Sequence, residues 1–328
     1  MRTETGLEKG ERRGRRPAWK AEAAVFLAVA FPAAGALGAL QPATGIPDEV
    51  LQLTQFGPAA GVLVAALVWP ERIRARLAGA GTGASGARKD TAWAGPGRTG
   101  PALLLTAPLI IALAAGAYAL LDGDARLTDP RSLAHPFTLI VLAQLLGACG
   151  EEIGWRCFLQ PLLRTRFGPV AASVAVGLLW GGWHVQVFAR RPAYAAGFLL
   201  AAVAMSVVLG LALDGVRADR LLLSGGFHTL VNLGMLLTMD EEDGAVPPMV
   251  LFGGACLVAA VAWALRSRRR SGARPDTTQQ DGTQPDGTQP DGTRPDGTQP
   301  AVAYREGAYR QEPVAGPDRI PAARHGAR

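Results

Sequence analysis

The chain contains eight apolar runs, each about as long as a helix needs to cross a bilayer. A hydrocarbon core of roughly 30 Å takes about 20 residues of α-helix. Lipid offers backbone groups no hydrogen-bond partners, and a helix pairs them internally. We therefore predict an all-α, polytopic membrane protein with about eight transmembrane helices. The expected helices cover residues 21–40, 51–69, 101–121, 136–160, 169–188, 194–213, 221–238 and 246–265.

Basic residues lie beside these runs. The net charge of +6 could indicate nucleic-acid binding, but Lys and Arg placed next to apolar runs set membrane orientation instead. We therefore expect no nucleic-acid partner. Eight helices put the basic segments 1–20, 71–100 and 266–270 on one side, with Arg190 and Arg191 as the exception. This pattern predicts a multi-pass protein of the cell membrane with both termini in the cytoplasm.

Composition divides the chain into four parts. Residues 1–20 form a basic cytoplasmic N-terminus, 21–121 hold the first three helices, and 136–265 form a membrane core of helices four to eight. Residues 271–328 contain a repeated Asp-Gly-Thr-Gln/Arg-Pro motif. Segments of this composition bury too little apolar surface to fold. We predict a disordered tail whose role the sequence does not define.

Three ionisable residues interrupt the fourth apolar run: Glu151, Glu152 and Arg156. A charge at the centre of a bilayer costs roughly 2.5–3.5 kcal/mol on insertion scales, so such residues are rare, paired and commonly functional. Glu152 and Arg156 stand four residues apart, which favours an ion pair on one helix face. Glu151 points about 100° away, and an unpaired carboxylate is suited to act as a general base.

Two later helices carry polar residues of complementary chemistry. His184 follows Trp180 by four residues, and Asn232 follows His228 by four. Histidine can move a proton, and both histidine and asparagine can donate hydrogen bonds. His228 and Asn232 are therefore candidates to stabilise an oxyanion. The alternative is purely structural, because intramembrane His and Asn also join helices by hydrogen bonds.

The order of these motifs resembles the signature of the CPBP family of intramembrane endopeptidases, which includes type II CAAX prenyl proteases and bacterial Abi proteins. The resemblance covers residues 136–238, and Trp180 stands where the family usually has Phe. It implies that Glu151 and His184 activate a water molecule. It also implies that His228 and Asn232 stabilise the oxyanion. Glu152, Arg156 and Trp180 would then support the site.

The same side chains could bind zinc, with Glu151, His184 and His228 as the alternative ligands. The resemblance to glutamate-type proteases favours a mechanism without a metal cofactor, whereas the residues alone do not separate the two. The expected substrate is a membrane-embedded or membrane-anchored peptide or protein. A prenyl group, the cleavage site and the oligomeric state cannot be predicted. A proton-coupled transporter and a non-catalytic immunity or scaffold protein are the alternatives. Many transporters show an internal repeat of the hydrophobic pattern, and its absence from this sequence argues against the transporter.

One expectation is in conflict with the others. A fifth helix over 169–188 places His184 nearer the outer side of the membrane than Glu151. A later start, a tilt or a kink of this helix would bring the two residues to one depth.

Overall fold

The computed structural model describes residues 18–77, 99–122, 127–214, 216, 219–239 and 244–272, all within the unit Met1–Pro275. These residues form helices and no strand, so the predicted all-α class is confirmed. The α-helices are α1 Ala18–Thr44, α2 Gly57–Val68, α3 Pro70–Leu77, α4 Thr99–Asp122, α5 Phe137–Glu152, α6 Gln160–Arg164, α7 Pro169–Trp183, α8 Pro192–Ala212, α9 Arg220–Thr238 and α10 Val246–Gly272. The 3₁₀ turns are η1 Leu53–Phe56, η3 Pro130–Ser132 and η5 Val185–Ala189, and η4 Ile153–Leu159 is a π-helix.

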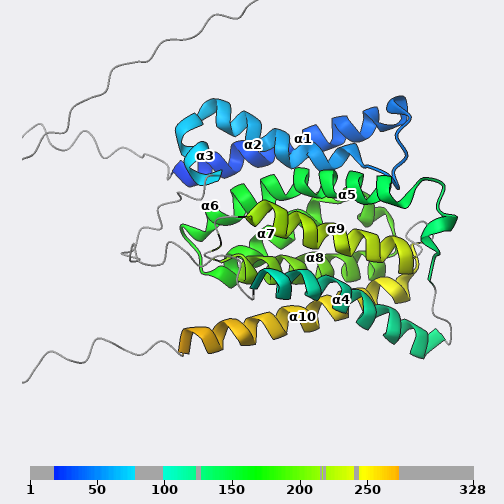
Figure 1. Ribbon diagram of the computed structural model, residues 1–328. Coiled ribbons are helices and arrows are strands. Elements are labelled where there is room, and N and C mark those ends of the chain that lie inside the picture. Colours follow the sequence, from blue (N-terminus) through cyan, green and yellow to red (C-terminus); the bar gives the residue numbers. More distant parts are fainter. Residues whose placement is uncertain are drawn as a thin grey trace, which may run out of the picture. The chain divides into compact units, whose positions relative to one another are not determined.

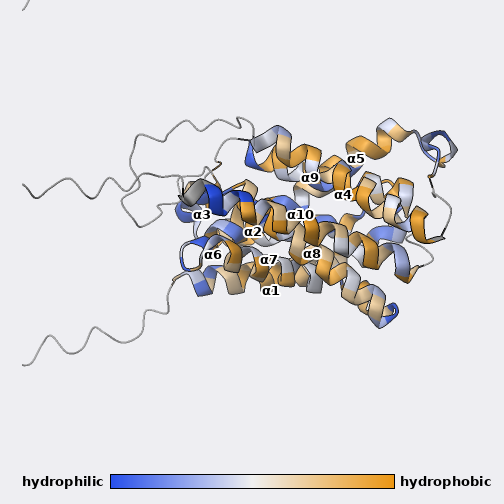
Figure 2. Ribbon diagram, turned by 90° about the horizontal axis from the view of Figure 1, so that it is seen from below, coloured by the Kyte–Doolittle hydropathy of each residue, from blue (hydrophilic) through white to orange (hydrophobic). Residues whose placement is uncertain are grey.

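The apolar helices agree with a multi-pass membrane protein. Six helical segments are long and apolar enough to cross a membrane by length and composition, and two shorter apolar helices accompany them. Together they follow the predicted order of eight. Figure 2 shows apolar residues along the helices and hydrophilic residues gathered around α3 and α6. The predicted disordered tail lies outside the described residues, except that α10 includes residues 271 and 272.

The described chain beside two of the basic segments differs from the prediction in its secondary structure. The helix α10 continues past residue 265 to Gly272, and the basic stretch expected as a loop at 71–100 begins with the helix α3. Ile73 of α3 is fully buried, and Arg76 donates to the buried Glu22 of α1 at 2.7 Å. The ion pair therefore joins α3 to α1, and the buried side chain packs α3 into the core beside α2 and η4, which its polar composition did not indicate.

The predicted end of the fourth helix before Pro161 is wrong. The helix runs without a break from Phe137 to Arg164, because α5 passes into η4 and then α6. Gln160 N–H bonds to the carbonyl of Trp155, five residues back. Pro161 lies in the first turn of α6, where a missing N–H is tolerated. The π-helix therefore lets the chain continue through a proline that would end a regular helix.

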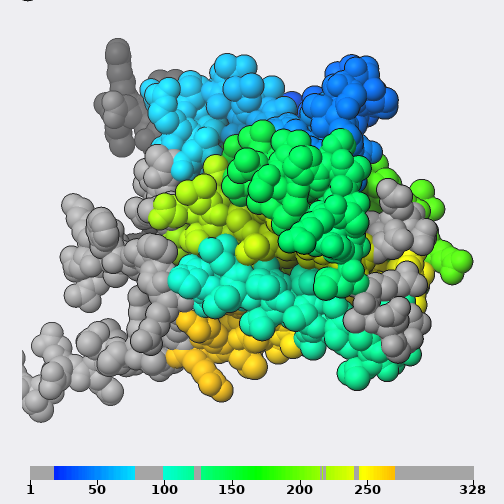
Figure 3. Space-filling view, turned by 45° about the vertical axis from the view of Figure 1, so that its right-hand side comes forward, coloured from blue at the N-terminus to red at the C-terminus, as the bar shows by residue number. Residues whose placement is uncertain are grey.

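The helices surround η4 and the end of α5. The helix α1 packs on α2, α5 lies between α2 and α9, and α4 contacts both α9 and α10 (Figure 1). Figure 3 shows the surface of α9 between those of α5 and α4. On the other side, α8 packs against α7 and α10. Segments far apart in the sequence thereby meet the polar residues of α5.

An aromatic cluster fixes α1 against the π-helix. Phe26 is fully buried, and its ring centroid lies 5.5 Å from that of Trp155 and 5.1 Å from that of Phe158. We expect Phe26→Ala to destabilise the protein by about 3–5 kcal/mol, because it leaves a cavity in a packed core. Thermal unfolding in detergent measures this loss. Leu67→Ala is the control, since Leu67 is 75% exposed. Equal melting temperatures for the two variants would contradict the role of this cluster.

Candidate active site

The end of α5 buries two carboxylates side by side. Glu151 is 2% exposed and Glu152 is fully buried. They are the last residues of α5 before the π-helix η4 begins at Ile153. π-helical turns are rare and occur frequently at functional sites. The two neighbouring side chains have different partners.

Glu151 is held by two neutral donors. Gln55 Nε2 of η1 donates to Glu151 Oε1 at 3.2 Å, and Trp180 Nε1 of α7 donates to Glu151 Oε2 at 2.7 Å. No cation forms an ion pair with this carboxylate in the part of the chain that the structure describes. Neutral donors orient a carboxylate without neutralising it, so Glu151 keeps the ability to accept a proton.

Glu152 lies between two nitrogen groups. The predicted ion pair is present, with Arg156 Nη1 at 3.0 Å from Glu152 Oε1. His228 Nδ1 of α9 approaches the same oxygen at 3.0 Å. With Glu151 counted, two carboxylates face one guanidinium, and a protonated His228 would bring the sum of the four charges to zero. Buried charge is costly unless it is paired, and Glu152 has both nitrogen groups as partners.

Trp180 is the residue that joins the groups of the site. Its indole N–H bonds to Glu151, and its carbonyl lies 2.9 Å from His184 Nδ1. The Arg156 guanidinium carbon stands 4.3 Å from the ring centroid of Trp180, a cation–π contact. The ring of His228 packs edge-on at 5.3 Å. The tryptophan predicted as a supporting residue therefore contacts all four neighbours.

His184 lies just beyond the end of α7. The predicted helix over 169–188 is too long, because α7 ends at Trp183 and η5 follows. Its 15 residues rise only about 22 Å, less than the roughly 30 Å of a hydrocarbon core. The end of a short helix need not reach the opposite surface, which accounts for the depth conflict. No hydrogen bond joins Glu151 and His184 directly, and Trp180 contacts both.

The backbone contact defines the tautomer of His184. A carbonyl oxygen only accepts, so Nδ1 carries the proton toward Trp180, and Nε2 of the neutral ring is an acceptor. The ring of His184 packs against those of Trp183 and Phe198, whose centroids each lie 4.9 Å from the centroid of the imidazole. The same reasoning applies to His228, where Nδ1 donates to Glu152. His228 can donate through Nε2 only as an imidazolium.

Asn232 stands one turn further along α9 and faces α5 as well. Its Nδ2 donates to Gln144 Oε1 at 3.0 Å, and Gln144 Nε2 donates to the carbonyl of Glu49 at 3.2 Å. An amide nitrogen has two N–H groups, so one donor of Asn232 is still available. His228 and Asn232 therefore both face α5, as their spacing predicts, with separate partners.

Two glutamines that contact the site were missed in the sequence. Gln55 and Gln144 are polar residues in apolar runs, the same signal that singled out Glu151, but neutral amides attract less notice than charges. The approach of Gln55 depends on Gly147 of α5. A Cβ at residue 147 would overlap the Gln55 amide, and one at Gly150 would lie 2.9 Å from the Phe56 ring. Glycine at these positions lets η1 reach the carboxylate.

Several buried polar atoms near the carboxylates have no partner within the protein. They are Gln55 Oε1, Glu152 Oε2, the Nε and Nη2 atoms of Arg156, and the indole nitrogens of Trp155 and Trp183. Most buried polar atoms in proteins are paired, and exceptions often mark places where water or a ligand binds. This set provides both donors and acceptors, so the site is chemically suited to hold water or a peptide group.

The site residues do not form a metal cluster. Among the described residues, no group of three or more His, Cys, Asp or Glu side chains is arranged to hold a metal ion. The alternative ligands Glu151 and His228 are engaged with other groups, and His184 directs Nδ1 to a carbonyl. The three cysteines are free thiols. As placed in this structure, the alternative ligands are not gathered around one point, although these Nδ1 contacts leave Nε2 of each histidine available to a metal.

Fold and site define a class: a multi-pass helical membrane protein that buries glutamates of α5, an arginine of η4 and a histidine of α9 in one polar cluster around a tryptophan of α7. Residues 133–234 match the family described as "Type II CAAX prenyl endopeptidase Rce1-like". This range contains the three motifs and every predicted site residue. The predicted resemblance to the CPBP family is therefore confirmed over this segment.

Known relatives are similar only in part. Lysostaphin resistance protein A of Staphylococcus aureus strains Newman and USA300 is 26% identical to this chain over 167 residues. The match covers 49% of this chain and 38% of the relative. The chain thus spans less than half the length of these relatives. Their name describes resistance to lysostaphin and specifies no catalytic residue.

Removing the guanidinium of Arg156, which pairs with Glu152, should destabilise the fold. We expect Arg156→Met to cost about 3–5 kcal/mol, because breaking a buried pair leaves an uncompensated charge. The double variant Glu152→Gln with Arg156→Met should recover most of this loss, since it removes both charges. Unfolding of the single and double variants in detergent measures the coupling. Additive effects of the two substitutions would show that the ion pair contributes nothing.

Proposed function

We propose that the protein is an intramembrane endopeptidase that hydrolyses a peptide bond of a membrane-associated substrate with water activated by Glu151 and His184. The observation that carries the proposal is the arrangement around Trp180, which holds an unneutralised carboxylate and a histidine with a free Nε2. The match to a family of CAAX-type endopeptidases supports the same kind of function. The geometry of the side chains favours a reaction without a metal cofactor.

In the proposed reaction, Glu151 accepts a proton from a water molecule that His184 Nε2 helps to align. The water oxygen attacks the scissile carbonyl carbon, and the carbonyl electrons move to its oxygen. The C–N bond then breaks, and the departing amine takes the proton held by Glu151. A general base at this position contributes typically 10²–10⁴-fold to the rate.

His228 and Asn232 are assigned to the oxyanion of the tetrahedral intermediate. The imidazolium of His228 has Nε2–H free when Nδ1 donates to Glu152, and Asn232 has its second amide hydrogen. Glu152 and Arg156 orient and balance His228. Donors preorganised at an oxyanion are each worth about 10²–10³-fold in kcat.

The substrate belongs in the bilayer, where the site is buried between helices. We propose a membrane-embedded or membrane-anchored peptide and assign no prenyl group to it. We also propose that the protein resides in the cell membrane with both termini in the cytoplasm, because an eight-helix topology assigns the three strongest basic segments of the sequence to one side. A non-catalytic immunity or scaffold role and a proton-coupled transporter are the competing functions, and cleavage distinguishes them.

Cleavage of fluorogenic and membrane-anchored peptides by the purified protein in detergent tests the proposal. We expect Glu151→Gln and His184→Ala each to reduce cleavage by at least about 10²-fold, since the first removes the proton acceptor and the second removes the group that aligns the water. Glu71→Gln is the matched control, because Glu71 is an exposed glutamate on α3. A strong chelator should leave wild-type activity unchanged.

Three results would contradict these assignments. Loss of activity on chelation with recovery in zinc would make the same residues metal ligands. Cleavage that survives both substitutions would mean that the site is elsewhere. Failure of folded, monodisperse wild type to cut any peptide of the panel would favour a non-catalytic role.

A further inference from the structure

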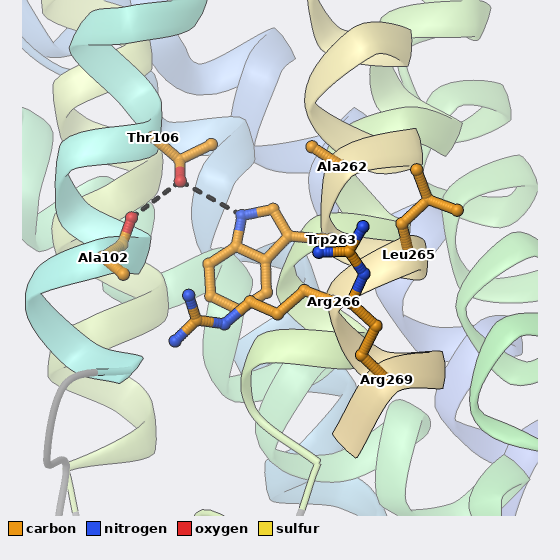
Figure 4. Close-up of a pocket in the computed structure, with 7 residues that line it drawn as sticks. All are labelled: Ala102, Thr106, Ala262, Trp263, Leu265, Arg266 and Arg269. Carbon is orange, nitrogen blue, oxygen red and sulfur yellow. Dashed lines mark hydrogen bonds between the residues drawn. The ribbon is translucent and has the colours of Figure 1, made fainter. Parts of the chain in front are cut away.

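A groove lies away from the candidate active site, between the beginning of α4 and the end of α10. Its volume is about 710 Å³, and its walls include Ala102 and Thr106 of α4 and Ala262, Trp263 and two arginines of α10. Figure 4 shows Trp263 reaching from α10 toward α4, with the side chains of Arg266 and Arg269 beside it. None of these residues contributes to the site around Glu151.

Trp263 forms a fixed wall of the groove. Its side chain is nearly buried, and Nε1 donates to the Thr106 hydroxyl at 3.1 Å. Thr106 in turn donates to the Ala102 carbonyl at 2.7 Å. The indole is therefore held in one orientation by a chain of hydrogen bonds across the two helices (Figure 4). A wall set in this way keeps the groove open beside the arginines.

The groove is positively charged. Arg266 and Arg269 are exposed, and no carboxylate of the described residues forms an ion pair with either. The Arg266 guanidinium carbon lies 5.6 Å from the centroid of the Trp263 ring. Arg76 and Arg164 at the same end of the helices differ, because each pairs with a carboxylate. The two arginines of the groove can therefore serve an external anion.

The position of the groove indicates the kind of anion. Leu265 ends the apolar part of α10, and Arg266 begins a basic run, so the groove lies at the level where a bilayer changes from hydrocarbon to headgroups. Leu105 of α4 and Val261 of α10 are 61% and 50% exposed. Apolar side chains of both helices thus face the region of acyl chains, next to charges at headgroup depth.

We propose that this groove binds the phosphate headgroup of an anionic phospholipid. Arg266 and Arg269 would pair with the phosphate, the indole of Trp263 would contact the glycerol region, and the acyl chains would lie along the apolar surfaces of α4 and α10. Basic pockets between transmembrane helices bind anionic headgroups in this way. A soluble phosphate would use the arginines but not the adjoining apolar surface, which favours a lipid.

Native mass spectrometry of the full chain in a nonionic detergent tests the proposal, with phosphatidylglycerol or phosphatidylcholine added. Wild type should retain phosphatidylglycerol preferentially. Arg266→Gln with Arg269→Gln should weaken retention about 10- to 30-fold, because each charge near an anionic lipid is worth about fivefold. Ala262→Phe should weaken it as well, since it fills the groove and keeps both charges.

The matched control is Arg74→Gln with Arg268→Gln, which removes two exposed arginines at the same end but outside the groove. This variant should retain phosphatidylglycerol as wild type does. Equal losses in the two double variants would overturn the site in favour of general charge attraction. Equal binding of the two lipids, or displacement of phosphatidylglycerol by millimolar inorganic phosphate, would overturn the lipid assignment. Normal retention of phosphatidylglycerol by Ala262→Phe would also overturn the lipid assignment.

Discussion

The structure depends on burying two adjacent carboxylates together with a single guanidinium. Such a cluster is unfavourable in an apolar interior unless every charge is paired or hydrogen-bonded. Partners come from distant parts of the chain: η1 supplies Gln55, α7 supplies Trp180, and α9 supplies His228. The assembly of these elements around α5 is therefore the way in which the fold satisfies Glu151 and Glu152. The apolar exteriors of the helices then place this assembly in a membrane.

The lengths of the apolar runs and the helical spacing of the polar residues made much of the fold and site predictable. Apolar runs of the right length gave the helices and their order, and the spacing of Glu152 and Arg156 gave their ion pair. The contact of His228 with Glu152 connects two of the predicted motifs. What the sequence could not show is how the helices face one another, because this depends on packing between distant segments. Gln55 and Gln144 become informative only once η1 and α9 are placed against α5.

Helix ends were the least predictable elements, and each error has a local cause. The helix α7 ends before His184 although the residues that follow are apolar, because η5 and Pro192 turn the chain into α8. Short helices such as α3 form where one buried side chain and one ion pair outweigh a polar composition. The burial and the ion pair of α3 are tertiary contacts, which a window of neighbouring residues does not contain.

The π-helix has a consequence for how this segment can change in length. Gln160 binds Ser173 of α7 at 2.9 Å, and Arg164 binds Asp214, both beyond η4, whereas Glu151 and Glu152 precede it. Deleting one residue between 153 and 159 would allow a regular α-helix to close, whereas deleting one residue from the regular helix α5 would rotate everything after it by about 100°. The two sets of contacts could then not be made at once. The π-helix is thus the part of this segment that can lose one residue while the two halves of the helix stay in phase and the helix remains long enough to span the membrane.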